Sequence, residues 1–184
     1  PIDGEQNYRR GLAPYGIAAA IYTDGKPTFS VIHIIDHARD GKERNTTITA
    51  SSERTGIRID DKDTGIQLAS ELNGNLIAGI GLPSEEYARL LELRMDIRMT
   101  DSVVYETANV VRGKVDAVMA FEIGLPALAC RLILEKAGLT VTDIEGNEMT
   151  LKSRSMIAAA HELHEVLLRQ GIHKENSGAL ANLS

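Results

Sequence analysis

The sequence contains a single cysteine, Cys130. One cysteine cannot form a disulfide within the chain, so the fold does not depend on one and a reducing cytoplasm is the simplest setting. Cys130 stands in an apolar helical stretch, where a free cysteine packs as a small hydrophobic residue. No apolar run approaches the ~20 residues that a membrane span needs, and the polar N-terminus shows no signal peptide. We therefore expect a cytoplasmic protein without a membrane partner.

Positive charge is also scarce. The chain has 20 Lys and Arg residues against 26 Asp and Glu residues, which gives a net charge of -6. A nucleic-acid partner requires a basic face, so this balance argues against one. Any anionic substrate must instead be held by a local site or by a metal ion. The 184 residues, of which 43% are hydrophobic, suffice for one large domain or for a domain and a half.

Residues 1–63 are expected to form one unit made of strands and turns. The sequence predicts a loop over residues 1–15 and then a hairpin from Ile17 to Ile35 around Asp24-Gly25. A second hairpin is predicted between residues 46–49 and 56–59, followed by a polar connection over residues 60–64.

Residues 64–184 are expected to form a second unit, in which strands alternate with amphipathic helices. Strands are predicted over residues 76–82, 115–121 and 140–144, and helices over residues 84–94, 102–111, 125–137 and 155–169. The first helix is expected to use Ser84 as its N-cap and to bury Tyr87, Leu90 and Leu91. A polar tail completes the chain from His173.

Three segments resemble the superfamily of inositol monophosphatases and fructose-1,6-bisphosphatases. The first is Pro1-Ile2-Asp3-Gly4-Glu5-Gln6-Asn7-Tyr8, similar to the family's Asp-Pro-Ile-Asp-Gly-Thr-x-Asn-Phe motif. The second is Arg112 to Ala117, similar to Gly-Arg-Val-Asp-Ala, and the third combines Leu132 to Gly138 with Thr142 to Gly146. Their order and spacing extend the resemblance over nearly the whole chain.

The resemblance implies an α/β fold, the α-β-α-β-α sandwich of the sugar-phosphatase type, with its N-terminal part missing from this chain. It implies hydrolysis of phosphate monoesters with Mg²⁺, a small phosphorylated metabolite as substrate, and a homodimer. The surfaces of residues 84–111 are a plausible dimer interface. Two or three Mg²⁺ ions at one phosphate need several carboxylates, because Mg²⁺ takes oxygen ligands.

The resemblance also assigns candidate site residues. Asp3 matches the second motif aspartate and is the candidate metal ligand, and Gly4 matches the glycine that approaches the phosphate. Glu5 replaces a threonine that orients the attacking water, which makes it the candidate catalytic residue. The family's substrate-contacting glutamate falls at Ala120, so Glu122 is the nearest substitute for substrate binding.

Other expected ligands are missing. The first motif aspartate and an upstream Glu-Glu segment would precede Pro1, and the last aspartate falls at Pro126 or Ala127. The site is therefore degenerate, and two functions stay open: a Mg²⁺-dependent hydrolase of inositol or sugar phosphates, or a non-catalytic binding or assembly module that dimerises.

Three weaker patterns are interpreted as structural. His161 and His164 lack the spacing of a zinc motif and are expected to be exposed or half-buried on a helix. Residues 60–65 lack the register of a calcium loop, and Gly79-x-Gly81 indicates close strand packing.

Overall fold

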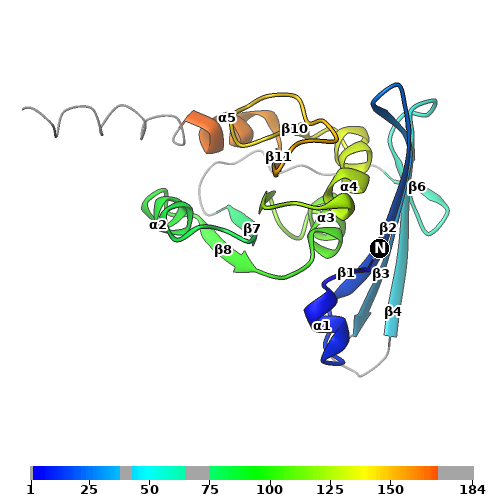
Figure 1. Ribbon diagram of the computed structural model, residues 1–184, viewed down its shortest axis with the longest axis horizontal. Coiled ribbons are helices and arrows are strands. Elements are labelled where there is room, and N and C mark those ends of the chain that lie inside the picture. Colours follow the sequence, from blue (N-terminus) through cyan, green and yellow to red (C-terminus); the bar gives the residue numbers. More distant parts are fainter. Residues whose placement is uncertain (1, 38–42, 65–74, 170–184) are drawn as a thin grey trace, which may run out of the picture.

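Two β-sheets and the helices that pack on them form successive layers in the computed structural model, which describes residues 2–37, 43–64 and 75–169 (Figure 1). One sheet is six-stranded and the other five-stranded. Helices α3 and α4 lie between the sheets, and α2 and α5 cover the far side of the five-stranded sheet. The described residues thus supply a β-α-β-α stack, which is four layers of the predicted five-layer sandwich.

The six-stranded sheet is an antiparallel meander in which each strand follows its neighbour in sequence. The predicted hairpin is confirmed, and its turn residues Asp24 and Gly25 both have positive φ. Side chains alternate along the strands, so that Ile32 and Ile48 are buried against the helices while Ile21 is exposed on the outer face. The strands are β1 (Ile2–Asp3), β2 (Tyr15–Thr23), β3 (Lys26–His37), β4 (Glu43–Ser51), β5 (Ile57–Ile59) and β6 (Lys62–Thr64).

The five-stranded sheet is mixed, with the order β10-β11-β9-β7-β8. β7 is parallel to β8 and β9, whereas β11 is antiparallel to β9 and β10. The strands are β7 (Leu76–Ile80), β8 (Asp96–Met99), β9 (Ala117–Phe121), β10 (Thr140–Thr142) and β11 (Ser155–Ala159). The helices are α1 (Glu5–Arg9), α2 (Ser84–Glu92), α3 (Val103–Val111), α4 (Leu125–Lys136) and α5 (His161–Arg169).

Two apolar clusters hold these layers together. The larger lies between the sheets, where residues of α3 and α4 such as Val104 and Ile133 pack against Ile32 and Ile48. The smaller lies on the other face of the five-stranded sheet and buries Leu90 of α2 and Leu163 of α5. None of the described helices is long and apolar enough to cross a membrane.

Several sequence predictions about local structure are wrong. The expected loop over residues 1–15 contains β1 and α1, and the expected polar connection contains β6. The predicted helix over residues 155–169 is a helix only from His161, because Ser155–Ala159 form an interior strand with all five residues buried. A short apolar run satisfies a buried strand as well as a buried helix, so periodicity does not distinguish them.

The helix α2 also differs from its prediction. Pro83 holds the N-cap position and Ser84 is the first helical residue. Leu90 is buried as expected, but Tyr87 and Leu91 are exposed. The described ranges leave out residues 65–74 and the tail from residue 170, so the boundary between the two predicted units stays a prediction.

Candidate functional site

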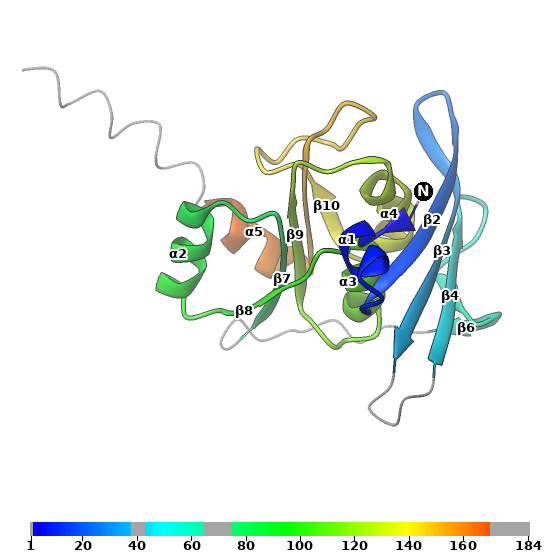
Figure 2. The same ribbon diagram turned by 60° about the horizontal axis from the view of Figure 1, so that its bottom comes forward.

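Residues 2–8, here called the motif loop, comprise β1, Gly4 and the first turn of α1, and they lie against the start of α3. β1 pairs with β2 so that Asp3 faces Gly16, and Figure 2 shows β1 and α1 beside α3. The Asp3 carboxylate accepts hydrogen bonds at Oδ2 from the Ser102 hydroxyl (2.6 Å) and from the Val104 backbone N–H (2.8 Å). Ser102 Oγ in turn accepts from the Tyr105 backbone N–H at 3.1 Å, as the N-cap of α3. The motif loop and the helix are therefore joined through one carboxylate.

Asp3 is partly buried, and this environment changes its acidity. Burial raises the pKa of the Asp3 carboxyl, and the nearby Asp101 charge raises it further. The hydrogen bonds from Ser102 and Val104 oppose this shift, because they stabilise the ionised form. A carboxylate held by such bonds has a fixed orientation, as metal-ligating carboxylates usually do.

Gly4 has no room for a side chain in its present conformation. Its φ of +76° lies in the left-handed region. A Cβ at this position would lie 3.0 Å from the carbonyl oxygen of Pro14 and 3.3 Å from the Ser102 Cβ. Glycine is therefore required for packing, independently of the predicted contact with substrate.

Glu5 and Glu122 do not converge on Asp3 in the described contacts. Glu5 is the first residue of α1, and its largely exposed side chain forms an ion pair with Arg9 one turn later. Glu122 follows β9 with a positive φ of 52° and is exposed. It lies two residues before Gly124, the N-cap of α4.

Two positions at which the family has an acidic residue are apolar in the structure. Ala120 is buried in β9, and Ala127 is buried in the first turn of α4, where Pro126 precedes it. Within residues 2–37, 43–64 and 75–169, no three His, Cys, Asp or Glu side chains lie close enough together to hold a metal ion. The described residues alone therefore do not fit a centre with two or three Mg²⁺ ions.

The structure shows the roles of the three weaker sequence patterns, which are the glycine pair, the acidic turn and the two histidines. A Cβ on Gly79 would lie 2.2 Å from Leu82 Cδ1, so the glycine pair reflects close packing as predicted. Asp60 and Asp61 form the turn between β5 and β6. The expectation of an exposed or half-buried His164 is wrong: it is fully buried, with Nε2 2.9 Å from Thr142 Oγ1, whereas His161 is exposed.

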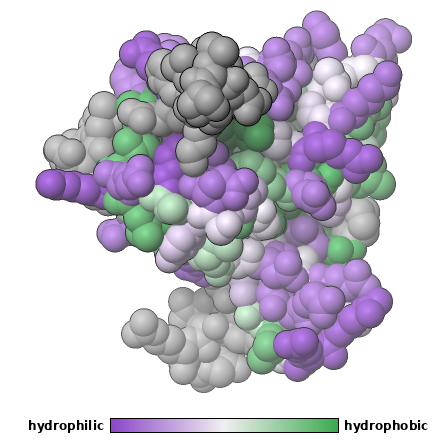
Figure 3. Space-filling view, turned by 60° about the vertical axis from the view of Figure 1, so that its left-hand side comes forward, coloured by the Kyte–Doolittle hydropathy of each residue, from purple (hydrophilic) through white to green (hydrophobic). Residues whose placement is uncertain are grey.

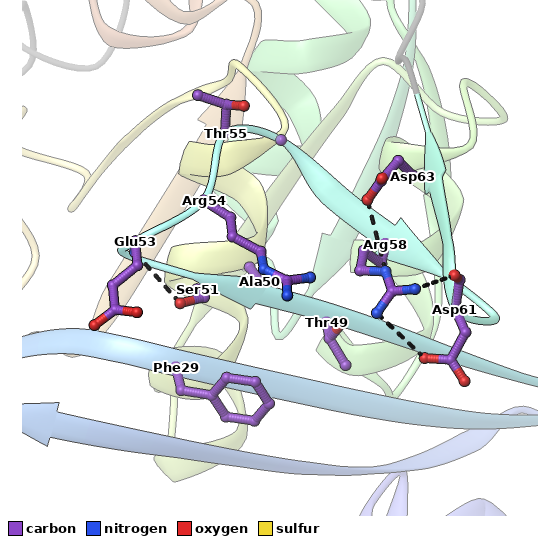
Figure 4. Close-up of a pocket in the computed structure, with 11 residues that line it drawn as sticks. Phe29, Thr49, Ala50, Ser51, Glu53, Arg54, Thr55, Arg58, Asp61 and Asp63 are labelled. Atoms are coloured by element: carbon purple, nitrogen blue, oxygen red, sulfur yellow. Dashed lines mark hydrogen bonds and ion pairs between the residues drawn. The ribbon is translucent and has the colours of Figure 1, made fainter.

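Two surface depressions lie away from the motif loop. The larger, about 440 Å³, lies between β3, β4 and the β5–β6 hairpin (Figure 4). Figure 4 shows Arg58 held by Asp61 and Asp63, at N–O distances of 3.7 and 3.6 Å. The smaller, about 350 Å³, lies at the start of α4, between residues 123–128 and 151–154.

The link between Asp3 and Ser102 was not predictable from the sequence. Ser102 has the local signature of a helix N-cap, and the sequence placed it at the start of this helix. Its partner Asp3 is 99 residues away, and no short-range pattern connects the two.

Comparison with known proteins identifies the family to which this chain is similar. The model of the inositol monophosphatase family matches residues 1–175. The Nus factor SuhB of Xylella fastidiosa is 28% identical over 198 residues, which cover 95% of this chain and 68% of that protein. The chain spans 64–68% of the length of the curated relatives that it matches.

Solved structures show the same fold. The extragenic suppressor protein suhB of Bartonella henselae has a TM-score of 0.78 at 22% identity, covering 95% of this chain and 67% of that one. A structure of SaIMPase-II with inositol monophosphate bound has a TM-score of 0.78 at 19% identity, covering 97% and 70%.

Proposed function

The chain belongs to the inositol monophosphatase family, and on this premise we propose that it forms part of a Mg²⁺-dependent hydrolase of inositol or sugar monophosphates. Among the described residues Asp3 is the one ligand of the family motif, and hydrolysis requires further carboxylates. The observation that carries the proposal is the position of Asp3, the motif aspartate, fixed by Ser102 and Val104 at the start of α3. A solved structure of the same fold contains inositol monophosphate, which favours this substrate class.

The chemistry of Asp3 suits this role. Mg²⁺ takes oxygen ligands, and a carboxylate whose orientation is already fixed loses little freedom when it binds the ion. When bound, the metal ions would neutralise the phosphate and activate a water molecule. The described residues hold no cluster of three possible ligands, so we expect this chain alone to bind Mg²⁺ weakly and to release no phosphate.

A non-catalytic binding or assembly module is the second candidate. The buried Ala127 and the adjacent Pro126 favour it, because a preceding segment cannot restore an oxygen ligand at the start of α4. The two functions differ in what added carboxylates do: they produce hydrolysis in the first and leave the protein inactive in the second.

The test begins with the genomic sequence upstream of the Pro1 codon. The chain of 184 residues and the form extended by any in-frame upstream segment are assayed for phosphate release from inositol monophosphate, with and without Mg²⁺. We expect no release from residues 1–184, and Mg²⁺-dependent release from the extended form that Asp3→Asn abolishes. An extended form that releases phosphate from neither inositol nor sugar monophosphates, or the absence of any upstream segment, would favour the non-catalytic module. Release by residues 1–184 alone would contradict the expectation that this chain lacks a complete metal site.

A further inference from the structure

The depression at the start of α4 has the dimensions of a small-molecule site. Its volume of about 350 Å³ lies near the lower end of the range for ligand pockets. One wall comes from the end of β9 and the start of α4, and the other from the turn that precedes β11. Gly124, Leu125 and Leu128 line the first wall, and Leu151, Lys152 and Arg154 line the second.

Hydrogen bonds fix both walls of this pocket. The backbone N–H of Ile123 donates to the carbonyl of Arg154 at 2.9 Å and joins the two walls directly. The Tyr22 hydroxyl donates to the carbonyl of Leu128 at 2.8 Å and anchors α4 to the six-stranded sheet. Ser153 Oγ accepts from the Thr150 N–H at 2.9 Å, which shapes the turn. The pocket is therefore part of the folded framework.

The charge of the pocket is opposite to that of the whole chain. Lys152 and Arg154 are its charged lining residues, and no acidic side chain lines it, although the protein carries a net charge of -6. Neither cation forms an ion pair or a side-chain hydrogen bond with any other described residue. The larger depression differs, because Glu53, Asp61 and Asp63 there outnumber its two arginines (Figure 4). The smaller pocket thus offers two unneutralised positive charges.

Large apolar side chains stand beside these charges. Leu125 is 69% exposed and Leu151 is 55% exposed. Both leucines line the pocket. A ligand that covers both leucines would remove this apolar surface from water, which is favourable.

We propose that this pocket binds an amphiphilic anion, in which an alkyl or aryl group carries one phosphate or carboxylate head. The head pairs with Lys152 and Arg154, and the apolar group lies against Leu125 and Leu151. No residue of the motif loop lines the pocket, so this binding requires neither Asp3 nor a metal ion. The proposal holds whether or not the protein hydrolyses phosphate esters.

The experiment uses the full chain in buffer with EDTA and four probes. Hexyl phosphate and hexanoate carry both parts of the ligand, whereas hexanol lacks the charge and inorganic phosphate lacks the apolar group. Backbone amide shifts in two-dimensional NMR locate the binding, and titration gives the Kd. We expect saturable binding of at least one amphiphilic anion, with shifts at Gly124, Leu125 and Lys152. Hexanol and phosphate should each bind at least tenfold more weakly, because each retains only one of the two interactions.

Variants of the protein separate the contribution of the two positive charges from that of the apolar part of the pocket. Lys152→Gln combined with Arg154→Gln should weaken the amphiphilic anion about tenfold or more and leave hexanol unchanged. Gly124→Leu should block the pocket while the protein stays folded, because an added Cβ there meets only Pro126 Cδ at 3.6 Å. Lys62→Gln, which removes an exposed cation on β6, is the matched control and should change nothing. The comparison of hexyl phosphate with hexanoate identifies the preferred head group. The proposal is overturned if neither anion binds saturably, or if binding survives both pocket variants.

Discussion

Asp3 links the motif loop to α3, and this structural role can be separated from metal binding. Burial raises the pKa of its carboxyl, so the folded protein loses stability as the pH rises through that raised pKa and the group ionises. An amide oxygen can accept the same hydrogen bonds from Ser102 and Val104 without a charge to desolvate. We therefore expect Asp3→Asn to be at least as stable as the wild type at pH 7.

The matched variant for this prediction is Asp3→Ala. It leaves the Ser102 hydroxyl and the Val104 N–H without their acceptor, which should cost about 1 kcal/mol. Urea unfolding monitored by circular dichroism measures both variants. If Asp3→Asn were as destabilised as Asp3→Ala, the ionised carboxylate itself would be needed for the fold.

His164 should make the stability of the fold depend on pH. Burial lowers its pKa, His161 lowers it further, and Glu165 raises it. Its Nδ1 is buried without a hydrogen-bond partner among the described residues. Because the unfolded chain binds the proton more readily, the free energy of unfolding falls as the pH decreases from about 6.5 to the lower folded pKa. The slope cannot exceed about 1.4 kcal/mol per pH unit for one group.

The variant His164→Gln tests this origin of the pH dependence. Glutamine can still meet Thr142 but does not titrate, so the slope between pH 5 and 7 should flatten in urea unfolding. His161→Gln is the control, because His161 is exposed on the same helix and its loss should preserve most of the slope. An unchanged slope in His164→Gln would assign the pH dependence to other groups.

At the scale of elements, the Arg131 side chain links α4 to the segment that follows β10 through hydrogen bonds. It is 7% exposed, its Nε lies 2.6 Å from Glu135, and its Nη2 lies 2.9 Å from Glu148. It also donates to the buried carbonyl of Met149. Arg131→Met should destabilise the protein by about 2 kcal/mol, mainly because this carbonyl loses its partner.

The control for Arg131 is Glu148→Gln. Glu148 is well exposed, so water can replace its ion pair and the midpoint of thermal unfolding should change far less than in Arg131→Met. Differential scanning fluorimetry compares the two. Equal losses would show that the ion pair, and not the bond to Met149, stabilises this contact.

Elements in which apolar residues recur at helical spacing over many residues were predictable from the sequence. Elements whose structure depends on tertiary neighbours were not. α4 has a stripe of apolar residues over 12 residues and was placed within one residue of its observed end. Ser155–Ala159 became a strand only because β9 and β10 flank it on both sides. The same limit applies to the site, where the motif identified Asp3 but only the fold brings Ser102 to it.

At the scale of the whole molecule, the exposed apolar residues restrict where two copies could associate. Within the expected interface over residues 84–111, α3 cannot contact a second copy, because all nine of its residues are buried. Tyr87 and Leu91 are exposed on α2, and Met99 is exposed on β8, which is an edge strand. Figure 3 brings forward the side on which α2 and β8 lie, where hydrophobic side chains emerge among hydrophilic ones. These three side chains are the surface through which we expect a homodimer to form.

The dimer prediction is tested by light scattering coupled to size exclusion. The wild type should elute with twice the mass of the 20.0 kDa chain, and Leu91→Glu combined with Met99→Glu should shift it to the monomer. A carboxylate buried in an apolar interface lacks a partner, which opposes association. Leu12→Glu changes another exposed leucine, outside α2 and β8, and should leave the dimer intact. A monomeric wild type would contradict the prediction. A dimer that survives the double variant would place the interface on another face. The outer side of the six-stranded sheet is the next candidate, because Ile17, Ile21 and Phe29 are exposed there.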